Sequence, residues 1–290
     1  MSEKAKITYF STKEPITCPI CAANVPKEEI LSGSGRLIAA DLTDELHRPY
    51  EKTSKFGAIY PLAYSTLVCP SCYFAALASD FKGQMLNETV RKLKNSGRNN
   101  LNNIKSYFSP LSFGEPRTLN EGIASYLLAI QCYELMDKNF APTFKQGLCS
   151  LRAAWLCDYL HHDVPHENYN YMALILKRKA SFYYRKAMEL EEQGTEPFTM
   201  QNFLGPDQDK NYGFEGVLYL SGLLEFKYGN KDNIELRIKT LEASRSAISR
   251  IVGMGKASKD KPTAILEQAR NLYNQIKEEL SELEKEQADA

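Results

Sequence analysis

The sequence lacks the features that mark membrane, secreted and strongly nucleic-acid-binding proteins. Its 36 Lys and Arg residues balance 36 Asp and Glu residues, so no overall charge attracts the chain to nucleic acid or anionic lipid. No segment approaches the roughly 18 consecutive apolar residues of a transmembrane helix. The first residues also lack the apolar core of a secretory signal. We therefore expect a cytoplasmic protein without a membrane span.

Common catalytic signatures are missing as well. The chain has no Walker A phosphate loop, no HExxH motif and no GxSxG motif. Three of its four histidines, His161, His162 and His166, lie close together. They could form a second metal site, or an acid–base group with Asp158 or Asp163, but a polar helix end explains them more simply. We expect a protein that is not an enzyme, and an enzyme using these histidines is the least favoured alternative.

Cysteine is the informative residue type, because four of the seven cysteines form two CxxC pairs. Cys18-Pro-Ile-Cys21 and Cys69-Pro-Ser-Cys72 can each present two thiolates from one tight turn, and two such turns make a tetrahedral site that suits zinc. Four thiolates fill the coordination shell, so the predicted Zn²⁺ is structural. An iron–sulfur cluster is the alternative. Residues 22–68 separate the pairs by more than the usual spacing of about 15–20 residues, which indicates an insertion.

The remaining cysteines and the fourth histidine have simpler interpretations. Cys132, Cys149 and Cys157 lie in apolar helical stretches, where free cysteine usually serves as a small core residue. His47 lies between the two CxxC pairs and could compete as a metal ligand. Because four cysteines already satisfy zinc, we do not expect His47 to bind the metal.

Three segments follow from the change in pattern along the chain. Residues 1–75 lack a helical period, and the run at 63–68 reads as a short strand that residues 36–40 could pair with. A helix is predicted to start at Tyr73 and to continue into a connector segment at 76–117. This segment becomes polar and broken after Ser96. Residues 118–290 are predicted to be helical, with a loop near 195–212.

The helical part begins with a capping box at Thr118 and Glu121. Helices are predicted at 118–136, 143–159, 167–192, 214–227, 234–252 and 263–287, with Trp155 as a core anchor and with Tyr171 and Phe182 among the apolar positions. Helix starts recur every 20–30 residues or so, which favours a tetratricopeptide-like (TPR-like) array of antiparallel hairpins. An ordinary helical bundle is the alternative. A solenoid would offer a groove for a peptide.

The predicted fold class is therefore mainly α, with an N-terminal four-cysteine zinc-ribbon-like module and a TPR-like helical-repeat domain. Its most consistent function is a zinc-binding adaptor whose groove binds another protein. A nucleic-acid-associated zinc-ribbon factor is the alternative, because zinc ribbons are frequent in transcription and translation machinery. Tyrosines near Lys177, Arg178, Lys179, Arg185 and Lys186 could also form a platform for single-stranded nucleic acid. We favour repeat-core tyrosines and solvent-facing basic residues there. The tyrosines concerned are Tyr169, Tyr171, Tyr183, Tyr184 and Tyr212.

Several motifs together resemble a bacterial family, domain of unknown function (DUF) 2225. The resemblance covers most of the chain and implies a cytoplasmic bacterial protein with a zinc-ribbon-like head and TPR-like helices; it implies no reaction. The chain differs where the family usually continues CGYA after the second pair, because Tyr73 stands in place of the glycine. The matching positions are Cys18, Arg36, Asp41, Tyr60-Pro61, Leu67-Val68, Cys69, Cys72, Ala75-Ala76, Asp80-Phe81, Leu151–Leu160 and Tyr219–Asn230.

Overall fold

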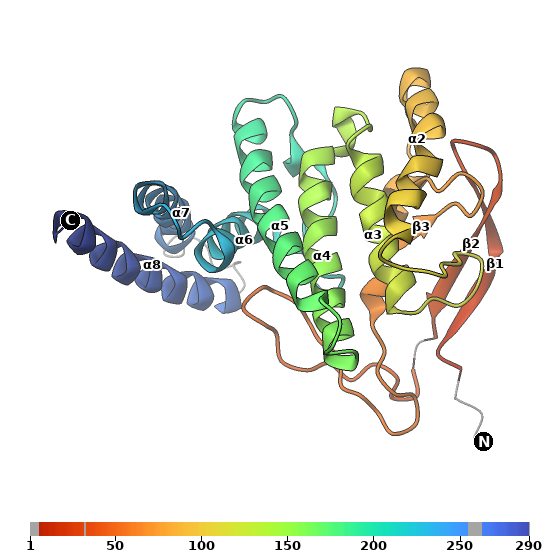
Figure 1. Cartoon of the computed structure of the whole chain (residues 1–290), viewed down its shortest axis with the longest axis horizontal. Helices are drawn as coiled ribbons and strands as arrows, with labels where there is room; N and C mark the ends of the chain where they lie inside the picture. Colours follow the sequence, from red (N-terminus) through yellow and green to blue (C-terminus); the bar gives the residue numbers. More distant parts are fainter. Residues whose placement is uncertain (1–5, 32, 255–262, 290) are drawn as a thin grey trace.

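A computed structural model describes residues 6–31, 33–254 and 263–289 of the chain. These residues form a mainly helical protein with a few short strands near the N-terminus (Figure 1). The strands and the first helices lie at one end, and the last helices lie at the other. The fold class predicted from the sequence, mainly α with a small N-terminal β portion, is confirmed.

Two antiparallel hairpins form the β portion. Strand β1 (Thr8–Thr17) pairs with β2 (Asn24–Ile30), and β3 (Thr66–Val68) pairs with β4 (Ala75–Leu77). The strand predicted at 63–68 is present only at its end, as β3, because a 3-10 helix covers Pro61–Tyr64. Its predicted pairing with residues 36–40 is wrong. Strand β3 pairs instead with β4, which follows it after a tight turn. Pairing with a strand so close in the sequence closes a shorter loop and therefore costs less chain entropy.

The strand β4 is covered on its other side by α3 (Leu119–Tyr133). The backbone N–H of Ala75 donates to Cys132 Sγ at 3.4 Å, and that of Leu77 donates to the Tyr133 hydroxyl at 3.1 Å. These bonds satisfy backbone groups that a sheet edge would otherwise leave unpaired. The small sheet is therefore attached to the helical part by polar contacts as well as by packing.

The prediction for the connector segment is wrong in two places. The chain after Tyr73 first forms β4 and the short helix α1 (Ala78–Phe81), and a long helix, α2 (Asn87–Lys105), starts only afterwards. Helix α2 runs through the polar stretch after Ser96 that suggested a loop. Its buried residues Leu93, Gly97, Leu101 and Ile104 recur every three or four positions, which is the pattern of a helix with one face on the core.

Helices α3, α4 (Pro142–Asp163) and α5 (Tyr169–Glu192) stand side by side in the centre of the molecule (Figure 1). The capping box is present, since Thr118 Oγ1 accepts from the Asn120 N–H and Glu121 accepts from the Thr118 N–H. Helix α4 packs against both neighbours and is buried along most of its length. It is the central element of the core.

The last three helices are α6 (Gly213–Tyr228), α7 (Ile234–Met254) and α8 (Thr263–Asp289). Helix α6 packs against α5 and α7, and α7 packs against α8. The guanidinium of Arg237, 1% exposed, donates to the carbonyls of Glu225 and Phe226 and pairs with Glu279 at 2.7 Å. One buried side chain of α7 thus ties the end of α6 to α8.

Two apolar residues of α5 depart from the prediction. Tyr171 is 63% exposed and Phe182 is 53% exposed, so neither belongs to the core. The buried residues of α5 include Ala173, Leu176 and Ala180, a narrow stripe of mostly small side chains. Short 3-10 helices complete the secondary structure at Pro61–Tyr64, Lys138–Phe140 and Phe198–Met200. No helix in the described ranges has the length and apolar character needed to cross a membrane.

Candidate metal centre and helical groove

Both CxxC pairs occupy the turns of the two β-hairpins. Cys18–Cys21 connects β1 to β2, and Cys69–Cys72 connects β3 to β4. The Cys18 N–H donates to Ala23 O at 2.9 Å, and the Cys69 N–H donates to Phe74 O at 2.9 Å. The two turns therefore have the same backbone pattern, although they are far apart in the sequence.

A second shared bond closes each turn. The Ala22 N–H donates to Cys18 O and the Tyr73 N–H donates to Cys69 O, both at 2.9 Å. Ala22 and Tyr73 each have a φ of 61° in these turns, a left-handed conformation that favours glycine. The position where Tyr73 replaces the family's usual glycine is therefore one whose backbone favours glycine.

The four thiols converge on one point between the turns. Their sulfur atoms all lie within 4.8 Å of one another, with 3.5 Å between Cys18 and Cys72 and 3.6 Å between Cys21 and Cys69. A tetrahedral metal with bonds of about 2.3 Å to sulfur places its ligands about 3.8 Å apart. The cysteines are not disulfide-bonded. The spacing of the four sulfurs therefore fits a tetrahedral thiolate-bound ion such as Zn²⁺.

The electrostatics of the cluster suit a cation. Hydrogen bonds from the Cys18 and Cys72 thiols hold the pKa of Cys69 well below its usual value. The interaction with Cys69 raises the pKa of Cys18 to about 12, and interactions with Cys18 and Cys69 raise the pKa of Cys72. The Ile20 N–H, 3.4 Å from Cys18 Sγ, is a further donor. A bound metal ion would replace the shared protons and neutralise the clustered negative charge.

The other three cysteines are core residues, as expected. Cys132, Cys149 and Cys157 are 1%, 0% and 0% exposed. Burial raises the pKa of each thiol to about 12, which keeps them protonated and unreactive. The division of the seven cysteines into four clustered and three packed is confirmed.

His47 is not part of the cluster, because its ring is held elsewhere. Nδ1 lies 2.5 Å from an oxygen of Asp207, and Nε2 lies 2.7 Å from the Tyr159 hydroxyl. The ring also stacks on Trp155 with 4.4 Å between centroids. The ionised carboxylate only accepts, so Nδ1 donates to it. Burial raises the pKa of Tyr159 well above its ordinary value, which argues against the phenol as a nucleophile.

A second buried group fixes the same segment to the helices. The carboxylate of Glu45 accepts from Trp155 Nε1 at 2.6 Å and from the Tyr228 hydroxyl, and it pairs with Lys227 at 3.1 Å. Glu45 is 6% exposed. Trp155 is buried in the core, and it also anchors α4 to the segment that separates the CxxC pairs.

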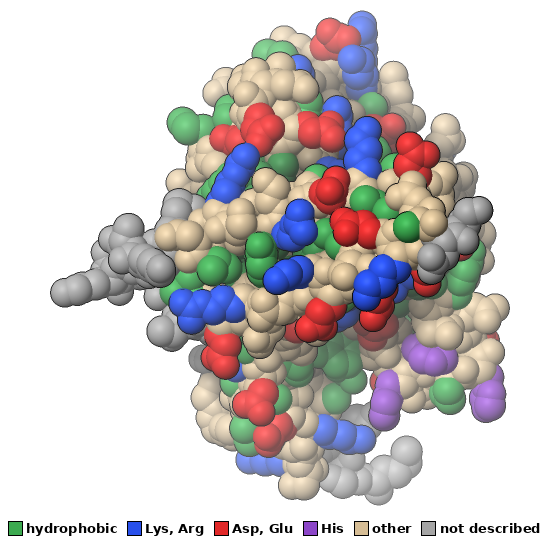
Figure 2. Space-filling view, turned by 90° about the vertical axis from the view of Figure 1, so that its left-hand side faces the viewer, with side chains coloured by type: hydrophobic (Ala, Val, Ile, Leu, Met, Phe, Trp, Pro, Cys, Tyr) green, Lys and Arg blue, Asp and Glu red, His purple; other side chains and the backbone are tan. Residues whose placement is uncertain are grey.

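The remaining histidines lie at the end of α4 and do not converge. His162 has 91% of its side chain exposed, His166 is exposed and His161 is partly exposed. Figure 2 shows histidine side chains on the surface. Asp158, one of the carboxylates considered with them, pairs with Lys177 at 2.6 Å. Within the described residues, the four cysteines form the only group of ligand atoms placed to hold a metal.

The tyrosines of the nucleic-acid alternative do not form a common platform. Tyr184 and Tyr212 are 0% and 5% exposed, whereas Tyr171 faces solvent. Tyr169 and Tyr183 are partly buried. A stacking platform needs several exposed rings in a row. The interpretation of these tyrosines as packing residues is correct for Tyr184 and Tyr212 and wrong for Tyr171.

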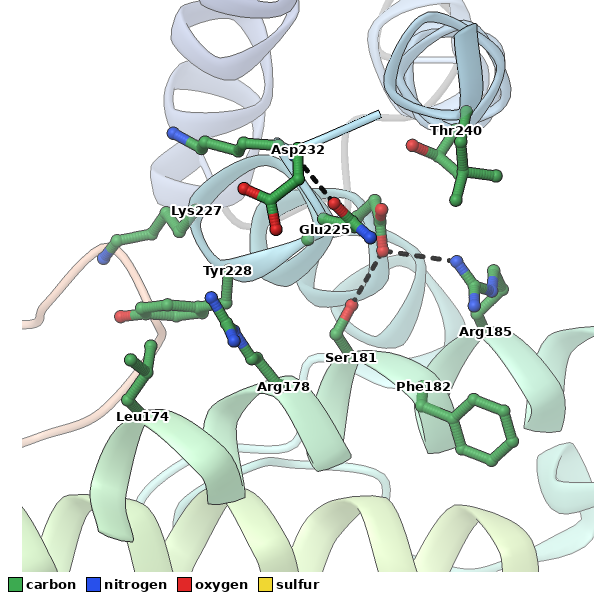
Figure 3. Close-up of a pocket in the computed structure, with 14 residues that line it drawn as sticks. Leu174, Arg178, Ser181, Phe182, Arg185, Glu225, Lys227, Tyr228, Asp232 and Thr240 are labelled. Carbon is green, nitrogen blue, oxygen red and sulfur yellow. Dashed lines mark hydrogen bonds and ion pairs between the residues drawn. The ribbon is translucent and has the colours of Figure 1, made fainter. Parts of the chain in front are cut away.

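A groove runs between α5 and α7, with α6 as its floor; we call it the α5–α7 groove. Two adjoining cavities of about 480 and 550 Å³ form it, and they share Arg185, Glu225, Leu236 and Thr240. Figure 3 shows the part where Glu225 accepts from Ser181 Oγ at 3.1 Å and pairs with Arg185 at 3.3 Å. Cavities of several hundred Å³ are of the size that binds ligands.

Comparison with known sequences identifies a family for the chain. A family described as "Uncharacterized protein conserved in bacteria (DUF2225)" matches residues 11–276, which include all four clustered cysteines. The chain belongs to this family. An uncharacterized protein of Borreliella burgdorferi is 46% identical over 279 residues, which cover 96% of this chain and 99% of the relative. No solved structure matches the chain at a significant level. The resemblance inferred from the motifs is therefore confirmed.

Sequence reasoning found the cysteines but missed the groove residues. Arg178 had been considered only as part of a tyrosine platform, and Phe182 only as a core residue. The available signal was the spacing in α5, where Arg178, Phe182 and Arg185 recur three or four positions apart and so share one helix face. The pattern alone did not indicate that α6 and α7 would turn this face into a groove wall.

Proposed function

We propose that this protein is a zinc-binding adaptor without catalytic activity, in which a structural metal site supports a helical surface that binds another protein. The closed set of four cysteine sulfurs carries this proposal. Four protein ligands leave no coordination position for water or substrate, which is the character of a structural site. Zinc fits better than an iron–sulfur cluster, because matched hairpin turns around one tetrahedral point suit a single ion.

The proposed location in the cytoplasm is consistent with free thiols, because a reducing compartment keeps cysteines available as metal ligands. The successive packing of α3 through α8 supports a TPR-like arrangement. In such an arrangement, the α5–α7 groove is the surface offered to a protein partner. A surface exposing Phe182 and Leu236 beside polar residues is typical of interaction sites.

Elemental analysis of the purified protein tests the metal site. We expect about one zinc ion per chain, and loss of that zinc in Cys18→Ser and Cys72→Ser, because each variant removes one of four ligands. The variants should also expose residues 1–75 to protease. Cys149→Ala, which changes a buried cysteine outside the cluster, is the matched control and should keep its zinc. Full zinc content in both serine variants would contradict the four-ligand assignment.

Cross-linking in the native bacterium tests the adaptor function. A photo-reactive amino acid at position 182 should capture a discrete protein, because this position lies in the groove and is 53% exposed. The same group at Tyr107, which is 64% exposed but is not among the residues that line the groove, is the control. Absence of a protein adduct specific to position 182 would argue against an adaptor that uses this groove.

A further inference from the structure

We infer that the α5–α7 groove recognises an acidic amphipathic segment of its protein partner; this inference rests on the proposed adaptor function and adds the chemistry of the ligand. The groove has three parts that matter for recognition. Helix α5 supplies one wall with Arg178 and Phe182, helix α7 supplies the other with Leu236 and Lys239, and α6 supplies the floor. Figure 3 shows side chains from all three helices directed into the space between them.

Apolar contact is available on both walls. Phe182 of α5 is 53% exposed and Leu236 of α7 is 44% exposed. Both line the groove, and partly exposed Leu174 and Met188 extend this surface along α5. Large apolar side chains on two facing walls would bury area against a ligand that carries apolar residues on one side. The ligand is therefore expected to be amphipathic.

The acidic groups of the groove are largely occupied. Glu225 is 7% exposed, and its carboxylate already bonds to Ser181 and Arg185. Glu189 pairs with Lys186 at 3.0 Å, and Glu192 lies 3.9 Å from Arg250. Pairs of this kind neutralise charge locally and leave little attraction for a basic ligand.

Several basic groups of the groove have no such partner. Among the described residues, Arg178, Lys231 and Lys239 make no ion pair or side-chain hydrogen bond with a carboxylate, and all three are exposed. Asp232 is the one groove carboxylate whose oxygens are likewise unbonded. The unpaired groups therefore number three positive against one negative. In Figure 3, Arg178 extends from α5 toward α6.

This local excess contrasts with the balance of the whole chain, whose formal net charge is zero. Figure 2 shows blue and red side chains interspersed over one face, with no broad field of a single sign. A long phosphate backbone needs an extended basic surface, whereas three cations beside apolar side chains fit a few carboxylates and an apolar ridge. We therefore infer a protein segment as the ligand and not a nucleic acid.

Fluorescence anisotropy with the zinc-loaded full chain tests this inference. The probe is a labelled amphipathic helical peptide of Leu, Ala and Glu, and its counterpart carries Lys at every Glu position. We expect the Glu peptide to bind at least about tenfold more tightly than the Lys peptide, with an affinity that falls as salt is added. Equal binding of the two peptides, or stronger binding of the Lys peptide, would overturn the inference.

Variants place the binding in the groove. Arg178→Glu and Lys239→Glu should each weaken binding of the Glu peptide by about tenfold. Phe182→Ala should weaken binding of both the Glu peptide and the Lys peptide. Arg98→Glu, a reversal of an exposed arginine on α2, is the control and should leave binding unchanged. An unchanged affinity of the Glu peptide for Arg178→Glu and Lys239→Glu would overturn the inference. Tight binding of single-stranded DNA would also overturn it, if both charge reversals abolish that binding and Phe182→Ala leaves it intact.

The two proposals fail in different ways. A protein adduct at position 182 that persists undiminished when Arg178 and Lys239 are reversed to Glu would preserve the adaptor function and reject the acidic ligand. Loss of every adduct at position 182 in the unchanged protein would reject the adaptor function itself. An adduct that disappears with the reversals, and whose captured segment is acidic, would support both.

Discussion

At the scale of single residues, the two CxxC turns depend on a backbone conformation that their sequence does not favour. Ala22 and Tyr73 each hold a φ of 61°. A side chain in the left-handed region costs on the order of 1 kcal/mol relative to glycine. This conformation turns the chain back after the second cysteine of each pair, so that the Cys18 N–H reaches Ala23 O and the Cys69 N–H reaches Phe74 O. The strain therefore lies in the two CxxC turns themselves.

Replacement of Ala22 by glycine should relieve this strain. We expect Ala22→Gly to raise the free energy of unfolding by up to about 1 kcal/mol without changing the zinc content. Chemical denaturation of the zinc-loaded protein measures the effect. Gly114→Ala, which changes a glycine with open space around it and an ordinary φ, serves as the comparison for general Gly/Ala effects. A clear loss of stability in Ala22→Gly would show that the left-handed position is not strained.

Trp155 has the most specific polar role among the buried aromatic residues. Its indole N–H is one of the donors that hold the buried carboxylate of Glu45. We expect Trp155→Phe to lower the free energy of unfolding by about 2 kcal/mol, because a hydrogen bond to a charged group is lost while a ring remains to stack on His47. Urea denaturation measures this change. Stability equal to that of the unchanged protein would mean that water replaces the indole donor.

At the scale of elements, helix α2 lies close against the second CxxC turn, and the residue of α2 at the point of closest approach is a glycine. A Cβ atom at Gly97 would lie only 2.0 Å from the carbonyl oxygen of Cys72. In the sequence, Ser96 and Gly97 suggested a break between elements. The same glycine has the opposite role in the structure, since it lets a continuous helix lie against the second turn. A glycine within a polar run does not by itself distinguish these two roles.

The close approach gives a sharp prediction. Gly97→Ala should destabilise the protein by about 2 kcal/mol or more and reduce zinc retention, because α2 or the second turn must move. Gly253→Ala on α7 is the matched control, since a Cβ there meets nothing within 4 Å and alanine favours a helix. Zinc release in the presence of a chelator reports on the turn, and thermal unfolding reports on stability. Equal behaviour of the two variants would refute the contact.

The elements that sequence reasoning predicted well are those whose own residues determine them. The capping box at Thr118 and Glu121 is local, and so are the periodic helices that follow it. Strands β1 and β2 were not predicted, because their alternation is weak and their stability comes from the turn at Cys18–Cys21. The partner of β3 was misassigned for the same reason, since pairing depends on the turn and not on strand propensity.

At the scale of the whole molecule, the segment between the CxxC pairs joins the β portion to α4, to α6 and to the loop that precedes α6. Asp44, Glu45 and His47 reach Lys227, Trp155 and Asp207 across long sequence distances. The long spacing between the CxxC pairs indicated an insertion here but not where the inserted segment packs. Contacts between residues far apart in the chain leave no periodic pattern in a single sequence. The four ligands could be read from the sequence, whereas the docking of this segment and the position of the groove could not.

Acid should loosen this docking. Burial acts to raise the pKa of Glu45 and Asp207, but Lys227 and the donors around Glu45, and His47 beside Asp207, bring both below their ordinary values of 4.5 and 3.8. A lowered pKa in the folded state means a stabilising contribution that is present above the ordinary value and lost as the pH falls below it. The difference in unfolding free energy between the unchanged protein and Glu45→Gln should therefore shrink below about pH 4.5. A difference that stays constant from neutral to acid pH would contradict this assignment.

The insertion also has a consequence for chain entropy. A metal ion held by the four cysteines would join Cys21 to Cys69 and so close a loop over residues 22–68. The cost of closing a loop rises with the length of its free chain, and the contacts of Glu45 and His47 divide this loop into two shorter arcs before any ion binds. Docking of the segment thus lowers the entropy cost of closing the loop when an ion binds. A bound ion in turn lowers the entropy cost of docking the segment. The two events should be positively cooperative, although one joins the two ends of the loop and the other fixes its middle.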